Sequence, residues 1–150
     1  MSCAYPNFNR TRNITNHSQL NDGEFKELFK TTALSPQLFT HEAHLRLAWI
    51  HINLYEEEVA IEIICKQIKD FDEIHGAGDK FHHSITVSSI KIMRHYILKS
   101  KSNRFEDFLL EFPRLLTSFK ELLLKHYSSN LIFSKKAKTG FVPPDLLPFG

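Results

Sequence analysis

The sequence predicts an all-α fold, a single compact bundle of five to six helices with an extended C-terminal tail packed over it. Three observations carry this prediction. Apolar residues recur at positions i, i+3, i+4 and i+7 in several segments longer than about ten residues, which is the spacing of an amphipathic helix. Most glycines and prolines, which interrupt helices, lie between these segments. The chain of 150 residues, 42% hydrophobic and 24% charged, also has the composition of one globular domain.

The chain is expected to begin with a flexible arm, residues 1–20, followed by a single helical domain, residues 21–150. The arm is rich in Asn, Ser and Thr and shows little periodicity, which is typical of flexible segments. His17, within the arm, is given no role. Asp22 is the expected N-cap of the first helix, which ends before Pro36.

The second predicted helix, residues 39–54, carries three of the nine histidines and is the segment most suggestive of function. Each helical residue advances by about 100°, so His44 and His51 lie about 20° apart and His41 lies within about 80° of both. These histidines therefore fall within the apolar stripe. The opposite face, expected to meet solvent, carries Glu42, Arg46 and Asn53.

Two further helices follow, separated by a glycine-containing loop over residues 70–80. The third helix has isoleucines at helical spacing and ends near Lys69. In the fourth, residues 81–99, the wheel places a polar row within the buried stripe, composed of His82, Thr86 and Ser89. The face expected to meet solvent carries Ser84, Ser88, Lys91 and His95.

The last part of the chain is expected to be helical from about residue 103 to residue 127, with an interruption at Pro113. Residues after 128 contain three prolines and several large apolar side chains. We expect them to form the extended tail, since so apolar a segment is not a solvated linker.

Composition and charge narrow the class of protein. The formal net charge is only +2, and the basic residues are scattered except for Lys135, Lys136 and Lys138, so nucleic acid is not an expected partner. No apolar run is long enough to span a membrane, and the N-terminus lacks the apolar core of a signal peptide, so the default location is cytoplasmic. The sequence leaves open whether the protein forms a homo-oligomer.

The histidines predict a metal site between the second and fourth helices. Imidazoles that converge from rigid helices are typical ligands of zinc and other first-row divalent ions, and His41, His44 and His82 form the predicted ligand set. His51 lies about 10 Å from His44 along the helix axis, so one metal is not expected to bind both. His51, Thr86 and Ser89 are the predicted catalytic residues, moving protons or orienting substrate.

Two alternatives remain open for these histidines. In the first, they are core residues whose ring nitrogens are satisfied by neighbouring hydroxyl groups. In the second, a histidine on one helix and a Ser/Thr row on another provide general acid/base catalysis without a metal, since imidazole titrates near neutral pH.

Three segments, FTHEAHLRLAW, FHHSIT and PDLLP, carry a resemblance to a known group of proteins. They resemble the F-x-H-x-x-H-L-x-x-A-W, [YF]-H-x-[ST]-I-T and P-D-x-x-P motifs of short, largely uncharacterised bacterial all-α proteins. Phe81 stands where tyrosine is more usual. The resemblance implies that the motif positions are occupied here by His41, His44, His82, Thr86 and Asp145.

These observations together predict a small enzyme that acts on a small polar metabolite through the histidine-rich site. A divalent metal there, zinc first among the candidates, would activate water or a carbonyl group in a hydrolase, lyase or isomerase. The alternative functions are a non-catalytic helical module that binds a ligand or metal, and a helical interaction protein whose histidines are structural.

Overall fold

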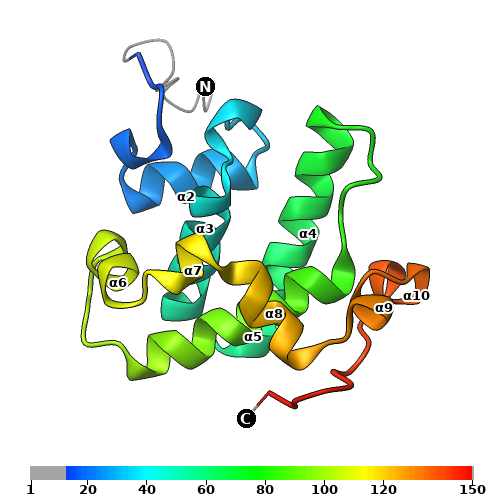
Figure 1. Cartoon of the computed structure of the whole chain (residues 1–150). Coiled ribbons are helices and arrows are strands. Elements are labelled where there is room, and N and C mark those ends of the chain that lie inside the picture. Colours follow the sequence, from blue (N-terminus) through cyan, green and yellow to red (C-terminus); the bar gives the residue numbers. More distant parts are fainter. Residues whose placement is uncertain (1–12, 150) are drawn as a thin grey trace.

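The computed structural model describes residues 13–149, and within this range it contains helices and loops but no strand. The all-α prediction is confirmed. Figure 1 shows the arrangement of the helices. They are α2 (Asp22–Lys30), α3 (His41–Leu54), α4 (Glu57–His75), α5 (His83–Lys99), α6 (Phe105–Glu111), α7 (Arg114–Thr117), α8 (Phe119–His126), α9 (Ser129–Ile132) and α10 (Lys135–Thr139), with 3-10 turns η1 (His17–Gln19) and η2 (Pro36–Leu38).

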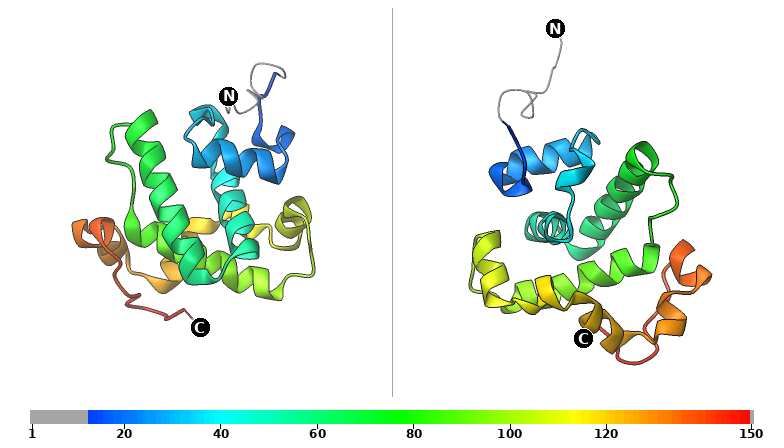
Figure 2. Two further views of the ribbon diagram at one scale, coloured as in Figure 1. Left: turned by 180° about the vertical axis from the view of Figure 1, so that it is seen from behind. Right: turned by 45° about the horizontal axis from the view of Figure 1, so that its top comes forward.

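Helix α3 is the centre of the bundle. It packs against α2, α4, α5 and α7, and the right-hand view of Figure 2 shows it enclosed by its neighbours. Every residue from 45 to 51 is buried, including Arg46, which is only 5% exposed. The predicted solvent face of this helix is therefore wrong at Arg46. The helical wheel assumes one buried stripe, whereas a central helix is covered on several sides.

Side chains at the helix N-termini explain where the first helices begin. Thr40 caps α3, its hydroxyl accepting a hydrogen bond from the Ala43 N–H at 3.2 Å. In α2 the N-cap is Asn21 rather than the predicted Asp22, because Asn21 and Glu24 form a reciprocal capping box. Helix α4 continues to His75, so the loop that follows is shorter than predicted.

The C-terminal part of the chain covers one side of α5. Pro113 separates α6 from α7, as the sequence predicts. The tail is extended only from Gly140 onward, since α9 and α10 precede it. The buried Tyr127 hydroxyl donates to the Val142 carbonyl at 2.7 Å and accepts from Ser88 Oγ at 3.0 Å. These bonds tie the tail to the bundle.

This packing corrects the predicted solvent face of α5. Ser84 and Ser88 are both 0% exposed, because the tail and α10 lie against that side of the helix. Ser84 Oγ donates to the Gly140 carbonyl and accepts from the Val142 N–H. The short serines leave room for the backbone of the tail and satisfy its polar groups. His95 is exposed, as predicted.

Most of the predicted N-terminal arm, residues 1–12, lies outside the described residues. The remaining part packs onto the bundle, where His17 and Leu20 are 2% and 1% exposed. His17 is therefore a structural residue, contrary to the expectation that it has no role. None of the helices within residues 13–149 is long and apolar enough to cross a membrane.

Candidate functional site

A mainly apolar cavity of about 350 Å³ lies among α3, α4, α5 and the beginning of α8. Four of its lining residues are polar, and all four were predicted as site residues: His41 and His44 on α3, Thr86 and Ser89 on α5. The apolar part of the lining consists of Leu45, Ala48, Ile64, Ile68, Ile85, Ile90, Met93 and Phe119. The structure thus brings together the histidines of one predicted helix and the hydroxyl groups of another.

The two histidines of the lining are held by backbone carbonyl groups, and both are exposed to solvent, so the prediction that they point into the buried stripe is wrong. His41 Nε2 lies 3.1 Å from the Leu115 carbonyl oxygen, and its ring meets Phe119 edge-on. His44 Nδ1 lies 2.8 Å from the Thr40 carbonyl oxygen, and its ring stacks on Phe39 with the ring centres 3.7 Å apart. These contacts fix both ring orientations.

Electrostatics favour the neutral form of His44. Part of the His44 side chain is exposed to solvent, but many protein atoms surround the ring. The resulting desolvation lowers the pKa of His44 below its ordinary value. The hydrogen bond to the Thr40 carbonyl partly opposes the shift, and the nearby His41 adds to it. The lowered pKa favours the neutral imidazole of His44, the form that can serve as a hydrogen-bond acceptor or a base.

The hydroxyl groups on α5 differ in their availability. Thr86 Oγ1 donates its proton to the His82 carbonyl at 2.8 Å, so toward a ligand it can only accept. Ser89 lines the cavity, and its Oγ has no hydrogen-bond partner among residues 13–149. Ser89 is consequently the hydroxyl that can both donate to and accept from a ligand in the cavity.

His82, the third predicted metal ligand, does not line this cavity. It is the N-cap of α5, where its Nδ1 accepts from the Ile85 N–H at 3.1 Å. Its Nε2 donates to the Ile132 carbonyl at 2.8 Å. Both ring nitrogens are thus occupied. His82 therefore does not join Thr86 and Ser89 in the cavity lining, although the helical wheel placed the three residues in one row.

His51 is also separate from the cavity. It is 0% exposed and stacks against Tyr55, and neither ring nitrogen has a hydrogen-bond partner among the residues that the structure describes. Burial and then the nearby Lys26 lower its pKa to about 4. His51 does not line the cavity, so it has no contact through which it could move protons for a substrate bound there, the role that the sequence predicts.

The three predicted metal ligands accordingly do not share a site in the structure. Within residues 13–149, no three His, Cys, Asp or Glu side chains gather in a way that could hold a metal ion. His41 and His44 share the cavity, but they bring only two imidazoles, fewer than the three or four protein ligands usual for zinc.

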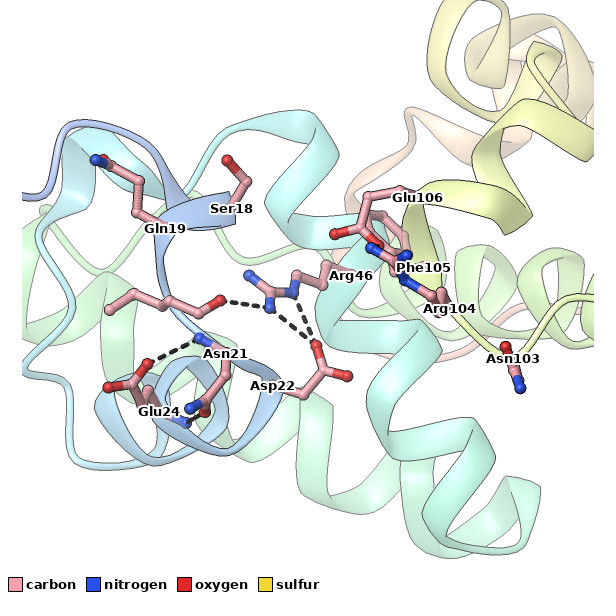
Figure 3. Close-up of a pocket in the computed structure, with 11 residues that line it drawn as sticks. Ser18, Gln19, Asn21, Asp22, Glu24, Arg46, Asn103, Arg104, Phe105 and Glu106 are labelled. Atoms are coloured by element: carbon pink, nitrogen blue, oxygen red, sulfur yellow. Dashed lines mark hydrogen bonds and ion pairs between the residues drawn. The ribbon is translucent and has the colours of Figure 1, made fainter.

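A buried arginine network that the sequence pattern does not reveal lies on another side of α3, and Figure 3 shows Arg46 with its hydrogen bonds to Asp22. The Arg46 guanidinium donates to the backbone carbonyls of His17 and Leu20, each at 2.7 Å. It also donates to Asp22 Oδ1 through Nε at 3.2 Å and Nη2 at 2.9 Å, and it stacks over Phe25. Arg46 thereby fastens the N-terminal segment to α3.

His17 extends this network. Its Nδ1 lies 3.3 Å from Arg46 Nη1 and accepts from it, and its Nε2 donates to Glu42 Oε2 at 2.7 Å. Burial is the main cause of a lowered His17 pKa. No local sequence pattern identifies this network, since its members are joined only when the N-terminal segment folds back over α3.

Comparisons with protein-family models, curated proteins and solved structures find no match to this chain. The assignment of function therefore depends on the geometry of the cavity.

Proposed function

We propose that the protein binds a small, largely apolar organic molecule in the cavity among α3, α4, α5 and α8. The observation that supports this most is the combination of a mainly apolar wall with His41, His44, Thr86 and Ser89. Small-molecule sites are typically concave and apolar, contain a few polar groups, and enclose about 300–1,000 Å³. The cavity, at about 350 Å³, suits a ligand at the small end of that range.

Conversion of the ligand by general acid/base catalysis is the second candidate function. It is favoured by the neutral His44, whose pKa is lowered by desolvation, together with the unpartnered Ser89 hydroxyl in the same cavity. A neutral imidazole can accept a proton from a bound substrate at neutral pH. This candidate retains the prediction of a small enzyme but needs no metal.

A zinc-dependent hydrolase, lyase or isomerase is the alternative that the sequence suggests. It would require His82 to give up its bonds to Ile85 and Ile132 and move to His41 and His44. The cavity proposal requires no such rearrangement, and we therefore prefer it. A cytoplasmic location and a partner other than nucleic acid stay predictions.

A cavity-filling substitution tests the proposed function. In Ser89→Leu the larger side chain occupies part of the cavity, and Arg94→Leu, at an exposed position on the same helix, is the matched control. Toluene should raise the melting temperature of the wild-type protein and of Arg94→Leu in a saturable manner, and the shift should be lost in Ser89→Leu. No saturable shift in the wild type, or an equal shift in all three proteins, would contradict the proposal.

A further inference from the structure

Resting on the proposed function, we propose that the cavity selects neutral ligands whose polar end is a hydrogen-bond donor, such as a phenol or an apolar alcohol, over carboxylates. The chemical basis is a pair of imidazoles, His41 and His44, whose backbone partners determine which nitrogen keeps a lone pair.

The partner of His41 determines its tautomer. A backbone carbonyl oxygen accepts hydrogen bonds and cannot donate them, so the contact of Nε2 with the Leu115 carbonyl places the proton on Nε2. In neutral His41 the lone pair is then on Nδ1. No residue within 13–149 hydrogen-bonds that atom, so it is the ring nitrogen left for a ligand.

His44 has the opposite tautomer and presents the same kind of group. Its Nδ1 must carry the proton because its partner is the Thr40 carbonyl, and the lone pair is on Nε2. Stacking on Phe39 holds the plane of the ring. Two residues of the cavity lining, His41 and His44, thus each keep in their neutral form one ring nitrogen with a lone pair that can accept a hydrogen bond.

The rest of the lining favours the same ligand class. None of the residues that the structure places around this cavity is Lys, Arg, Asp or Glu, so no fixed positive charge is present to balance a carboxylate. Burying an unbalanced anion against apolar walls is costly. Thr86 adds a third acceptor, because its proton is committed to the His82 carbonyl. Among the lining side chains, Ser89 has the one donor that makes no hydrogen bond within residues 13–149.

Three matched probes distinguish this inference from the proposed function. Toluene, p-cresol and p-toluate share a methylated ring and differ in having no polar group, a hydroxyl donor or a carboxylate. Titration at neutral pH, followed by chemical shifts of the α3 and α5 amides, should show p-cresol binding roughly fivefold more tightly than toluene, the effect of about one neutral hydrogen bond. Binding of p-toluate should be weaker than that of toluene.

Two variants identify the acceptors. His44→Phe and His41→Phe keep an aromatic ring but remove the nitrogens, and His95→Phe is the control at an exposed position away from the cavity. The preference for p-cresol over toluene should fall toward onefold in at least one cavity variant and persist in the control. Circular dichroism and the melting temperature verify that each variant is folded.

The outcomes are separable. Equal binding of toluene and p-cresol, tighter binding of p-toluate, or a p-cresol preference unchanged in both cavity variants would overturn the donor inference while leaving the proposed function intact. Failure of all three probes to bind the wild-type protein would overturn the proposed function itself.

Discussion

His82 Nε2 donates a 2.8 Å hydrogen bond to the backbone carbonyl of Ile132, fifty residues further along the chain. On its other side the same ring accepts from the Ile85 N–H and begins α5. A single imidazole therefore caps a helix and ties it to α9. This double role explains why His82, which matches a sequence motif, can be a structural residue.

Replacing His82 should lower stability without affecting the cavity. His82→Ala removes the N-cap acceptor and leaves the Ile132 carbonyl without its donor, so we expect a loss of about 1–3 kcal/mol in the free energy of unfolding, measured by urea denaturation. His82→Asn should recover part of this loss, since asparagine is a good N-cap.

The exposed His95→Ala serves as the control for this experiment, with an expected change within about 0.5 kcal/mol. Binding of toluene by folded His82→Ala should match that of the wild-type protein. If His82→Ala abolished binding while remaining folded, His82 would belong to the functional site.

Arg46 should be intolerant even of lysine. Arg46→Lys keeps the charge but lacks the planar fork that reaches the carbonyls of both His17 and Leu20 as well as Asp22. Leaving buried carbonyls without donors should cost about 2–4 kcal/mol in chemical denaturation. Arg94→Lys, at an exposed position, should be close to neutral. Equal effects of the two substitutions would show that Arg46 does not fasten the N-terminal segment to α3.

Acidification should destabilise the protein through His51. Its pKa is lowered to about 4, so between pH 6.5 and 4 the unfolded chain binds more protons at this position than the folded state. The stabilising effect of neutral His51 is complete above about pH 6.5 and declines as pH falls, with a slope of up to about 1.4 kcal/mol per pH unit.

His51→Phe isolates this contribution, since phenylalanine fills a similar space and does not titrate. The difference in unfolding free energy between His51→Phe and the wild-type protein should increase as pH falls from 7 to 4.5. Taking the difference between the unfolding free energies of the two proteins removes the contributions of other histidines with lowered pKa, such as His17 and His82, which both proteins share. Parallel pH profiles would show that His51 does not titrate as described.

Zinc addition should leave the melting temperature of untagged protein nearly unchanged, because only His41 and His44 share the cavity. Elemental analysis after purification provides an independent measurement. One tightly bound zinc per chain, lost in both His44→Ala and His82→Ala but kept in His95→Ala, would instead support the ligand set that the sequence suggests.

Local pattern was sufficient to predict the longer helices and some of the site, but not the short helices α9 and α10. Helical spacing identifies the segments that became α3, α4 and α5, and Pro113 ends α6 as expected, because these effects act over a few residues. The same local geometry places His41 with His44, and Thr86 with Ser89, on faces that meet at one cavity.

The partners of the other polar residues were decided by the tertiary structure. Arg46 faces the returning N-terminal segment, Ser88 faces Tyr127, and His82 reaches Ile132. A helical wheel assigns each residue an angle about the helix, but which angles are buried depends on the segments that pack there. The sequence by itself therefore determined the longer helices and the pair of histidine and hydroxyl faces, whereas long-range packing decided which histidines line the cavity and which became structural.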